Sequence, residues 1–185
     1  MSLQLNKQLA DLKEKSDKYY GERNEVRTQK RAEIIDNVKN HFISYLTEQG
    51  FQCDENHHSK LVNADYKGDI KLSFKYDDPT TNYMGCDGAF EISRISGTRS
   101  AKQVKSVFVM ESENLPSFNG FFRGEEDRLK SEIKFYEEEL LPAQKRIGTS
   151  DLTGEYSLGV FDPDTSRGLS LISKTIPELI DEVMS

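Results

Sequence analysis

At 185 residues, the chain is long enough for one domain with an appendage, and 35% hydrophobic beside 31% charged residues makes it more polar than a compact body alone. A net charge of −7 at pH 7 disfavours nucleic acid as a general partner, because such binding depends on neutralising phosphates. Two distant cysteines argue against a disulfide framework, and no apolar run reaches membrane-span length, so we expect a soluble cytoplasmic protein.

The N-terminal stretch Leu3–Gln49 predicts one long helix, because it has no proline and a single glycine. That glycine, Gly21, is the predicted position of a break or kink, since glycine weakens a helix interior. Gly50 is the predicted residue just past its end. Seven positions repeat at intervals of four and three residues, which is the spacing of a coiled-coil seam with two polar interruptions. They are Leu5, Leu9, Leu12, Ser16, Tyr19, Arg23 and Val26.

The second half of this helix carries a wider apolar stripe, which is typical of a helix facing a globular core. The stripe consists of Ile34, Ile35, Val38, Phe42, Ile43, Tyr45 and Leu46. We therefore predict two domains: residues 1–26 form a helical arm or coiled-coil segment, and residues 27–185 form a single α+β domain.

A second helix is predicted over Gly124–Ile147, with acidic residues in its first turn and apolar residues at helical spacing. Pro142 lies inside this pattern and predicts a kink or an end near Leu141. The helix is acidic, whereas the first helix carries several basic residues, so opposite charge favours their pairing. The sequence leaves open whether the arm pairs with this helix in the same chain or with a second copy.

Alternation of apolar and polar residues predicts strands, most clearly over Asp69–Tyr76. Further strands are predicted over Ala89–Ile95, Val104–Met110, Tyr156–Phe161 and Leu169–Ile172, a weak one over Leu61–Tyr66, and a short one starting near Phe51 and Cys53. Thr175 with Pro177 and Glu178 predicts a capped C-terminal helix. The predicted fold class is α+β: a long N-terminal helix packs with the acidic second helix against a mainly antiparallel sheet of about five strands, with a short C-terminal helix.

Asp69 at the start of one strand and Glu91 on the next strong one are the catalytic candidates. This order of elements resembles the core of restriction-endonuclease-like nucleases, in which an Asp and a Glu-x-Lys hold Mg²⁺ and orient water. The resemblance implies a divergent Mg²⁺-dependent nuclease using Asp69 and Glu91, with Glu33 as a carboxylate on the helix. Ser93 stands where that family has its lysine.

Metal and cofactor motifs are weaker. Cys53, His57 and His58 supply three of the four ligands that a structural zinc ion needs, so we predict a solvated loop instead. The run Asp162–Gly168 departs from the calcium-loop pattern at its glycine and lacks the bidentate glutamate, which favours a hairpin turn. No phosphate-binding, dinucleotide-binding or nucleophile motif occurs, so no cofactor and no metal are predicted.

Two surface features remain. Arg23, Arg27, Lys30 and Arg31 form a basic stripe at helical spacing, the one place where nucleic acid could bind, although a solvated or internally paired face is the simpler interpretation. Phe118, Phe121 and Phe122 either cap the core or, if exposed, form a partner-binding patch.

The leading hypothesis is a non-enzymatic protein-binding or assembly protein that forms a homodimer or binds another protein through its N-terminal arm. The predicted interaction residues are Leu5, Leu9, Leu12, Tyr19, Arg23, Val26, Arg27, Phe118, Phe121 and Phe122. The alternatives are the nuclease described above and an acidic decoy that inhibits a nucleic-acid-binding protein.

Overall fold

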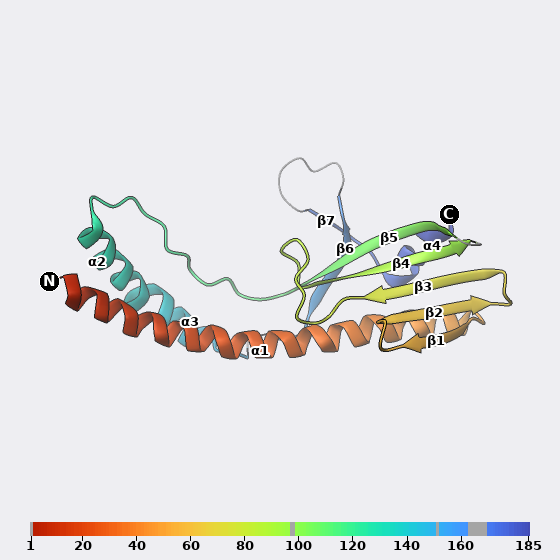
Figure 1. The fold of residues 1–185 in the computed structure, drawn as a ribbon, viewed down its shortest axis with the longest axis horizontal. Helices are drawn as coiled ribbons and strands as arrows, with labels where there is room; N and C mark the ends of the chain where they lie inside the picture. The colour runs from red at the N-terminus through yellow and green to blue at the C-terminus, as the bar shows by residue number, and fades with distance from the viewer. Residues whose placement is uncertain (1, 97–98, 151, 163–169) are drawn as a thin grey trace. The chain divides into compact units, whose positions relative to one another are not determined.

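The computed structural model describes residues 2–96, 99–150, 152–162 and 170–185. Its helices are α1 (Ser2–Glu48), α2 (Glu125–Phe135), α3 (Leu141–Ile147) and α4 (Ile176–Met184), and a π-helical turn, η1 (Tyr136–Leu140), joins α2 to α3. Its strands are β1 (Gln52–Asn56), β2 (Leu61–Tyr66), β3 (Ile70–Tyr76), β4 (Gly88–Ser96), β5 (Arg99–Met110), β6 (Tyr156–Phe161) and β7 (Leu171–Ser173). The predicted α+β class is confirmed (Figure 1).

The long N-terminal helix is confirmed, and it is continuous. The predicted break or kink at Gly21 does not interrupt it: the helix runs from Ser2 to Glu48 without a gap. The helix ends as predicted at Gly50, whose φ of 87° lies in the left-handed region that glycine adopts without steric cost. The amide of Phe51 then donates to the carbonyl of Leu46 at 3.0 Å, which satisfies a carbonyl group at the end of the helix.

Backbone proximity divides the chain into two compact units. One, here called the helical unit, contains residues 1–27 and 112–153, and the other, here called the body, contains residues 28–111 and 154–185. Helix α1 therefore contributes its first half to one unit and its second half to the other. The predicted division into 1–26 and 27–185 stays a prediction, while residues 112–153 group with the arm rather than with the body.

The body contains one antiparallel sheet whose strands lie in sequence order, β1 to β7. The sheet has seven described strands rather than the predicted five or so, because the weak segments at β1 and β2 pair along their whole length, Gln52 opposite Asp65 through Asn56 opposite Leu61. Backbone pairing thus forms strands from two segments whose sequences show little alternation of apolar and polar residues. The sequence also predicts a hairpin turn over Gly97–Ser100, of which residues 97 and 98 lie outside the described residues.

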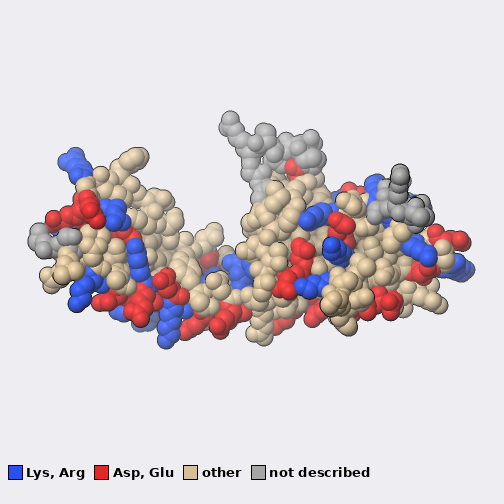
Figure 2. All heavy atoms as spheres, viewed as in Figure 1, with Lys and Arg blue, Asp and Glu red and all other residues tan. Residues whose placement is uncertain are grey.

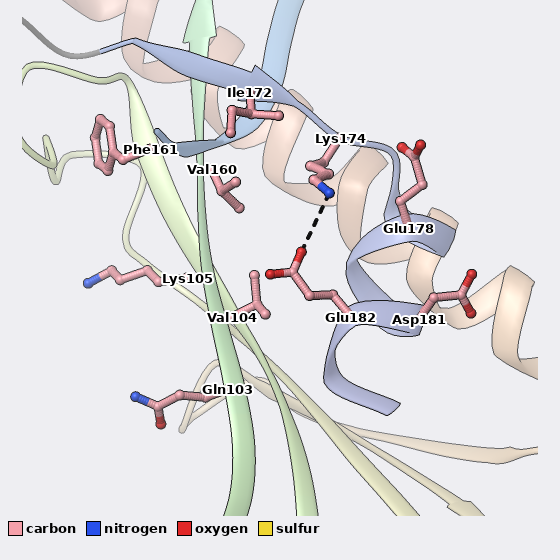
Figure 3. Close-up of a pocket in the computed structure, with 10 residues that line it drawn as sticks. All are labelled: Gln103, Val104, Lys105, Val160, Phe161, Ile172, Lys174, Glu178, Asp181 and Glu182. Carbon is pink, nitrogen blue, oxygen red and sulfur yellow. Dashed lines mark ion pairs between the residues drawn. The ribbon is translucent and has the colours of Figure 1, made fainter. Parts of the chain in front are cut away.

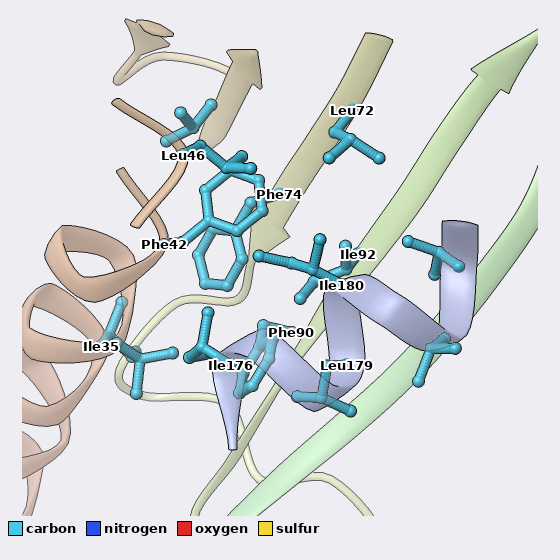
Figure 4. Packing of buried hydrophobic residues seen from close by; sticks show 14 of the residues in the cluster. Ile35, Phe42, Leu46, Leu72, Phe74, Phe90, Ile92, Ile176, Leu179 and Ile180 are labelled. Carbon is cyan, nitrogen blue, oxygen red and sulfur yellow. The ribbon is translucent and has the colours of Figure 1, made fainter. Parts of the chain in front are cut away.

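The body core lies between the inner face of the sheet, the second half of α1 and α4 (Figure 4). The rings of Phe42 on α1 and Phe74 on β3 meet with centroids 5.1 Å apart. Helix α4 begins with the predicted capping box: the Glu178 amide donates to Thr175 Oγ1, and Glu178 Oε2 accepts from the Thr175 amide. The cap fixes the start of α4, so that Ile176, Leu179 and Ile180 face the sheet.

A buried ion pair ties α1 to the segment before β4. The Arg31 guanidinium donates to Asp87 Oδ1 through Nη2 at 3.1 Å and through Nε at 3.3 Å. The other carboxylate oxygen of Asp87 accepts from the amide of Met110 on β5 at 2.9 Å. Both side chains are withdrawn from water, with 10% and 2% of their surfaces exposed, so each neutralises a charge that would be costly to bury alone.

Replacing Arg31 by methionine should therefore lower the free energy of unfolding by about 3–5 kcal/mol, because it leaves the Asp87 carboxylate buried without its cation. Urea denaturation followed by circular dichroism measures the change. The matched control is Lys30→Met on the same helix turn, which removes a partly exposed pair with Glu33 and should cost less than about 1 kcal/mol. Equal effects of the two substitutions would contradict this account of Asp87.

A second polar cluster joins α1 to the edge strand. Glu55 Oε1 on β1 accepts from Lys39 Nζ at 2.9 Å and from the Tyr76 hydroxyl at 3.1 Å. Burial raises the pKa of Glu55, but the two hydrogen bonds and the nearby positive charge of Lys39 together outweigh it and leave the pKa below the ordinary value of 4.5. The charged form of Glu55 is thus the form that stabilises the fold.

The sign of the pH dependence follows from that lowered pKa. The stabilisation from Glu55 is complete at neutral pH and is lost as the pH falls from about 4.5 through the pKa in the folded state. Wild type should therefore be more stable than Glu55→Gln at pH 7, and the difference should shrink as the pH falls below 4.5. Thermal melting of both proteins across this range tests the prediction, and a constant difference would refute it.

Candidate functional site

The two candidate catalytic carboxylates do not meet. Asp69 lies in the turn before β3, whereas Glu91 on β4 pairs with Lys75, near the other end of β3. Six residues at about 3.4 Å each separate the two positions by roughly 20 Å, much farther than two ligands of one cation can be. Glu91 has a lysine opposite it on each side, Lys75 and Lys105, and accepts a hydrogen bond from Ser93 Oγ at 3.3 Å.

The cysteine and histidine candidates are also dispersed. Burial raises the pKa of both thiols, Cys53 and Cys86, so neither is a ready thiolate at neutral pH. His57 contacts Glu55 at 3.0 Å, and His58 is exposed in the turn between β1 and β2. Within the described ranges, no three His, Cys, Asp or Glu side chains cluster closely enough to hold a metal ion. The calcium-like turn after Asp162 lies mostly outside the described residues.

The seam of the arm is filled within the same chain. Leu9 and Leu12 on α1 are buried against Leu129 and Ile133 on α2, with Leu5, Tyr136 and Leu141 at the margin. Lys13 Nζ forms an ion pair of 2.7 Å with Glu132 beside this cluster. The predicted pairing of the arm with the acidic helix is therefore present in cis, and a partner that used Leu9 and Leu12 would have to displace α2.

The two polar interruptions of the seam have specific partners in this pairing. Gln144 Nε2 on α3 donates to Ser16 Oγ at 2.8 Å, in a buried contact. Tyr19 Oη donates to the carbonyl of Gly148 at 2.9 Å, and Arg23 Nη1 donates to Tyr19 Oη at 2.7 Å. Seam positions 16 and 19 thus lie opposite positions 144 and 148, which shows that the two helices run in the same direction.

The second helix reaches Gly148 by passing through Pro142. A π-helical turn, η1, precedes the proline, and the Leu141 amide donates to the Tyr136 carbonyl five residues back. The wider turn accommodates a residue that lacks an amide donor. The predicted disturbance near Leu141 is therefore present as a π-turn, after which α3 continues to Ile147.

The basic stripe is largely used inside the chain. Arg23 is buried and binds the end of α3, Arg31 is buried with Asp87, and Lys30 pairs with Glu33 at 2.8 Å. Arg27 also has an interaction in the structure. On the face that Figure 2 shows, positive and negative side chains are interspersed over both units. On that face, neither an extended basic stripe nor a wide acidic patch is seen (Figure 2).

The three phenylalanines before α2 differ sharply in exposure. Phe118 stacks on Phe122 with ring centroids 5.3 Å apart and an interplanar angle of 12°, and it also contacts Phe135 at 5.4 Å. Phe121 is fully exposed, at 107%. Gly120 permits this arrangement, because a Cβ there would lie 2.6 Å from the Phe122 ring. The turn that brings two rings together therefore directs the third into solvent.

A cleft on the body was not predicted from the sequence. It has a volume of about 720 Å³ and lies between β5, β6, β7 and α4 (Figure 3). Apolar side chains of Val104, Val160 and Ile172 line it, and carboxylates of α4 lie along one side. The sequence gives little signal for this cleft, because Val104 is a buried core residue and Val160 packs against the same core.

Comparison with known proteins gives no relative: no family model matches the chain, and neither curated proteins nor solved structures yielded a match. No described helix carries the apolar run that a membrane-spanning helix needs. Function must therefore be argued from the residues of this chain alone.

The filled seam makes a direct prediction. Leu12→Ala should lower the stability of the α1–α2 pairing by about 2–5 kcal/mol, because it leaves a cavity beside Leu129 and Ile133. Leu3→Ala on the same helix is the matched control and should change stability by less than about 0.5 kcal/mol, since Leu3 is exposed. Hydrogen exchange of the α2 amides measures both effects. Unchanged exchange in Leu12→Ala would show that α2 does not cover the seam in solution.

Proposed function

We propose that this chain is a non-enzymatic assembly protein whose helical unit binds a second copy of the chain. The observation that carries the proposal is the fully exposed ring of Phe121 beside the stacked pair Phe118 and Phe122. Burying a phenylalanine side chain stabilises a protein by about 1.5–3 kcal/mol, so a ring held entirely in water is a strong anchor for an interface.

The distribution of apolar surface supports the helical unit as the contact. Of the described large hydrophobic side chains, the exposed ones are Leu3, Tyr20, Met84, Phe121 and Ile172. Three of these belong to the helical unit, although it is the smaller of the two. The seam itself is occupied in cis, so the interface proposed here uses Phe121 rather than Leu9 and Leu12.

Charge supports a second copy as the occupant. The helical unit carries twelve Lys and Arg against fourteen Asp and Glu, a net charge of −2, whereas the body carries thirteen against eighteen, a net charge of −5. Two bodies therefore repel each other more than two helical units do. Self-association is accordingly least opposed through the helical unit.

The test is the solution molar mass of the full chain, measured by light scattering over a wide concentration range. Wild type should approach the mass of a dimer, and Phe121→Ser should raise the dissociation constant by at least about tenfold, because each dimer loses two buried rings. Met84→Ser is the matched control: it removes an apolar side chain that is 58% exposed on the body and should leave the dimer intact.

Two results would overturn the proposal. One is a wild-type chain that stays monomeric at every concentration. The other is a dimer that Met84→Ser weakens as much as Phe121→Ser does, which would place the interface on the body. Because both side chains are exposed, neither substitution is expected to unfold the chain, and circular dichroism checks this.

A further inference from the structure

The sheet of the body is incompletely paired beside β5. Strand β6 pairs with β5 only from Val107 to Met110, while β5 itself extends back to Arg99. Beyond Gly159, β6 turns away and pairs with β7 instead. On this side, none of the described strands pairs with β5 between Arg99 and Ser106.

Gly159 is the point at which the strands separate. It pairs with Val107 on β5 and with Ser173 on β7. A Cβ at this position would lie 2.4 Å from the carbonyl oxygen of Ile172, so only glycine lets β7 approach this closely. Glycine at this position thus allows the close β6–β7 pairing at the residue where the β5–β6 pairing ends.

The resulting cleft combines an unpaired backbone edge with apolar and acidic surfaces (Figure 3). In an antiparallel strand, alternate residues direct their N–H and C=O groups to opposite sides, so β5 presents donors and acceptors to the cleft. Val104, Val160 and Ile172 line the cleft, and Ile172 is 43% exposed. Its volume of about 720 Å³ falls in the usual range of ligand sites.

One wall of the cleft is negatively charged. Of the described lining residues on that side, Asp181 and Glu182 on α4 contribute carboxylates and Lys174 contributes a cation, whereas the Glu178 carboxylate accepts hydrogen bonds from Thr175 in the capping box. Lys174 Nζ lies 3.7 Å from Glu182 Oε2, too far for a hydrogen bond. That oxygen is buried and accepts no hydrogen bond from the described residues. Lys105 lies over the Tyr83 ring instead, 3.7 Å from its centroid.

We infer that this cleft binds an extended segment of a protein partner that adds a strand to β5 and places a lysine or arginine against α4. The unpaired edge selects an extended backbone, the apolar lining selects alternate apolar side chains, and the α4 carboxylates select a positive charge. This site lies on the body and is independent of self-association through the helical unit.

The probe is a synthetic, end-blocked heptapeptide that alternates valine with threonine and carries one lysine, with the lysine placed at each polar position in turn. Hydrogen exchange of the full chain is measured by mass spectrometry with and without peptide. At ten times the dissociation constant, amides between Lys102 and Ser106 should exchange about tenfold more slowly, because protection follows the bound fraction. Two further peptides are N-methylated at alternate residues, one on the peptide edge that faces β5 and one on the opposite edge. Only the first should lose binding, because its methyl groups replace the N–H donors that would pair with β5.

Substitution of the wall provides the second readout. Glu182→Gln should weaken the lysine peptide about three- to fivefold, as expected for a partly exposed charge pair, and should bring its affinity close to that of a glutamate-containing peptide. Glu138→Gln, on the helical unit, is the matched control and should change nothing. Three results would overturn the inference: no protection of β5, equal binding of lysine and glutamate peptides to wild type, or equal binding of both N-methylated peptides.

Discussion

Burial of the two apolar stripes of α1 is the constraint on which the rest of this structure depends. A helix of 47 residues gains most of its stability from packing, and this one has two faces to bury. Its first half buries Leu9 and Leu12 against α2, and its second half buries Phe42 and Leu46 in the body core. Because α1 is one continuous helix, the chain must supply a partner for each half. The long excursion between β5 and β6 supplies the first of them.

Polar residues set the register of that first pairing. A narrow leucine seam alone would tolerate several alignments, whereas Ser16 with Gln144 and Arg23 with the end of α3 match only one. The same polar residues would make the seam a poor surface for a second copy, because their hydrogen bonds require groups of α3. The proposed self-association therefore uses apolar surface that the pairing leaves uncovered, of which Phe121 is the clearest example.

The body has a cleft where β6 leaves β5 in an otherwise regular sheet. A regular antiparallel meander would pair β5 along its whole length, but β6 pairs with it only from Val107 to Met110, and Gly159 lets β7 approach β6 closely. Unpaired edges promote unwanted association, so natural sheets usually cover them or make them short. Here the edge lies beside an acidic helix, which restricts the strands that can add to it.

The sequence by itself determined the local structure: the long helix and its end at Gly50, the strong strands, the capping box at Thr175 and the presence of a seam. These features follow from residue spacing, turn chemistry and helix capping, which act over a few neighbouring residues. Only the tertiary structure decided that the seam closes in cis, that Asp69 and Glu91 lie far apart, that Phe121 is exposed and that β6 leaves β5. Each of those outcomes depends on which distant segments meet, and that choice is made by the summed burial and hydrogen bonding of the whole chain.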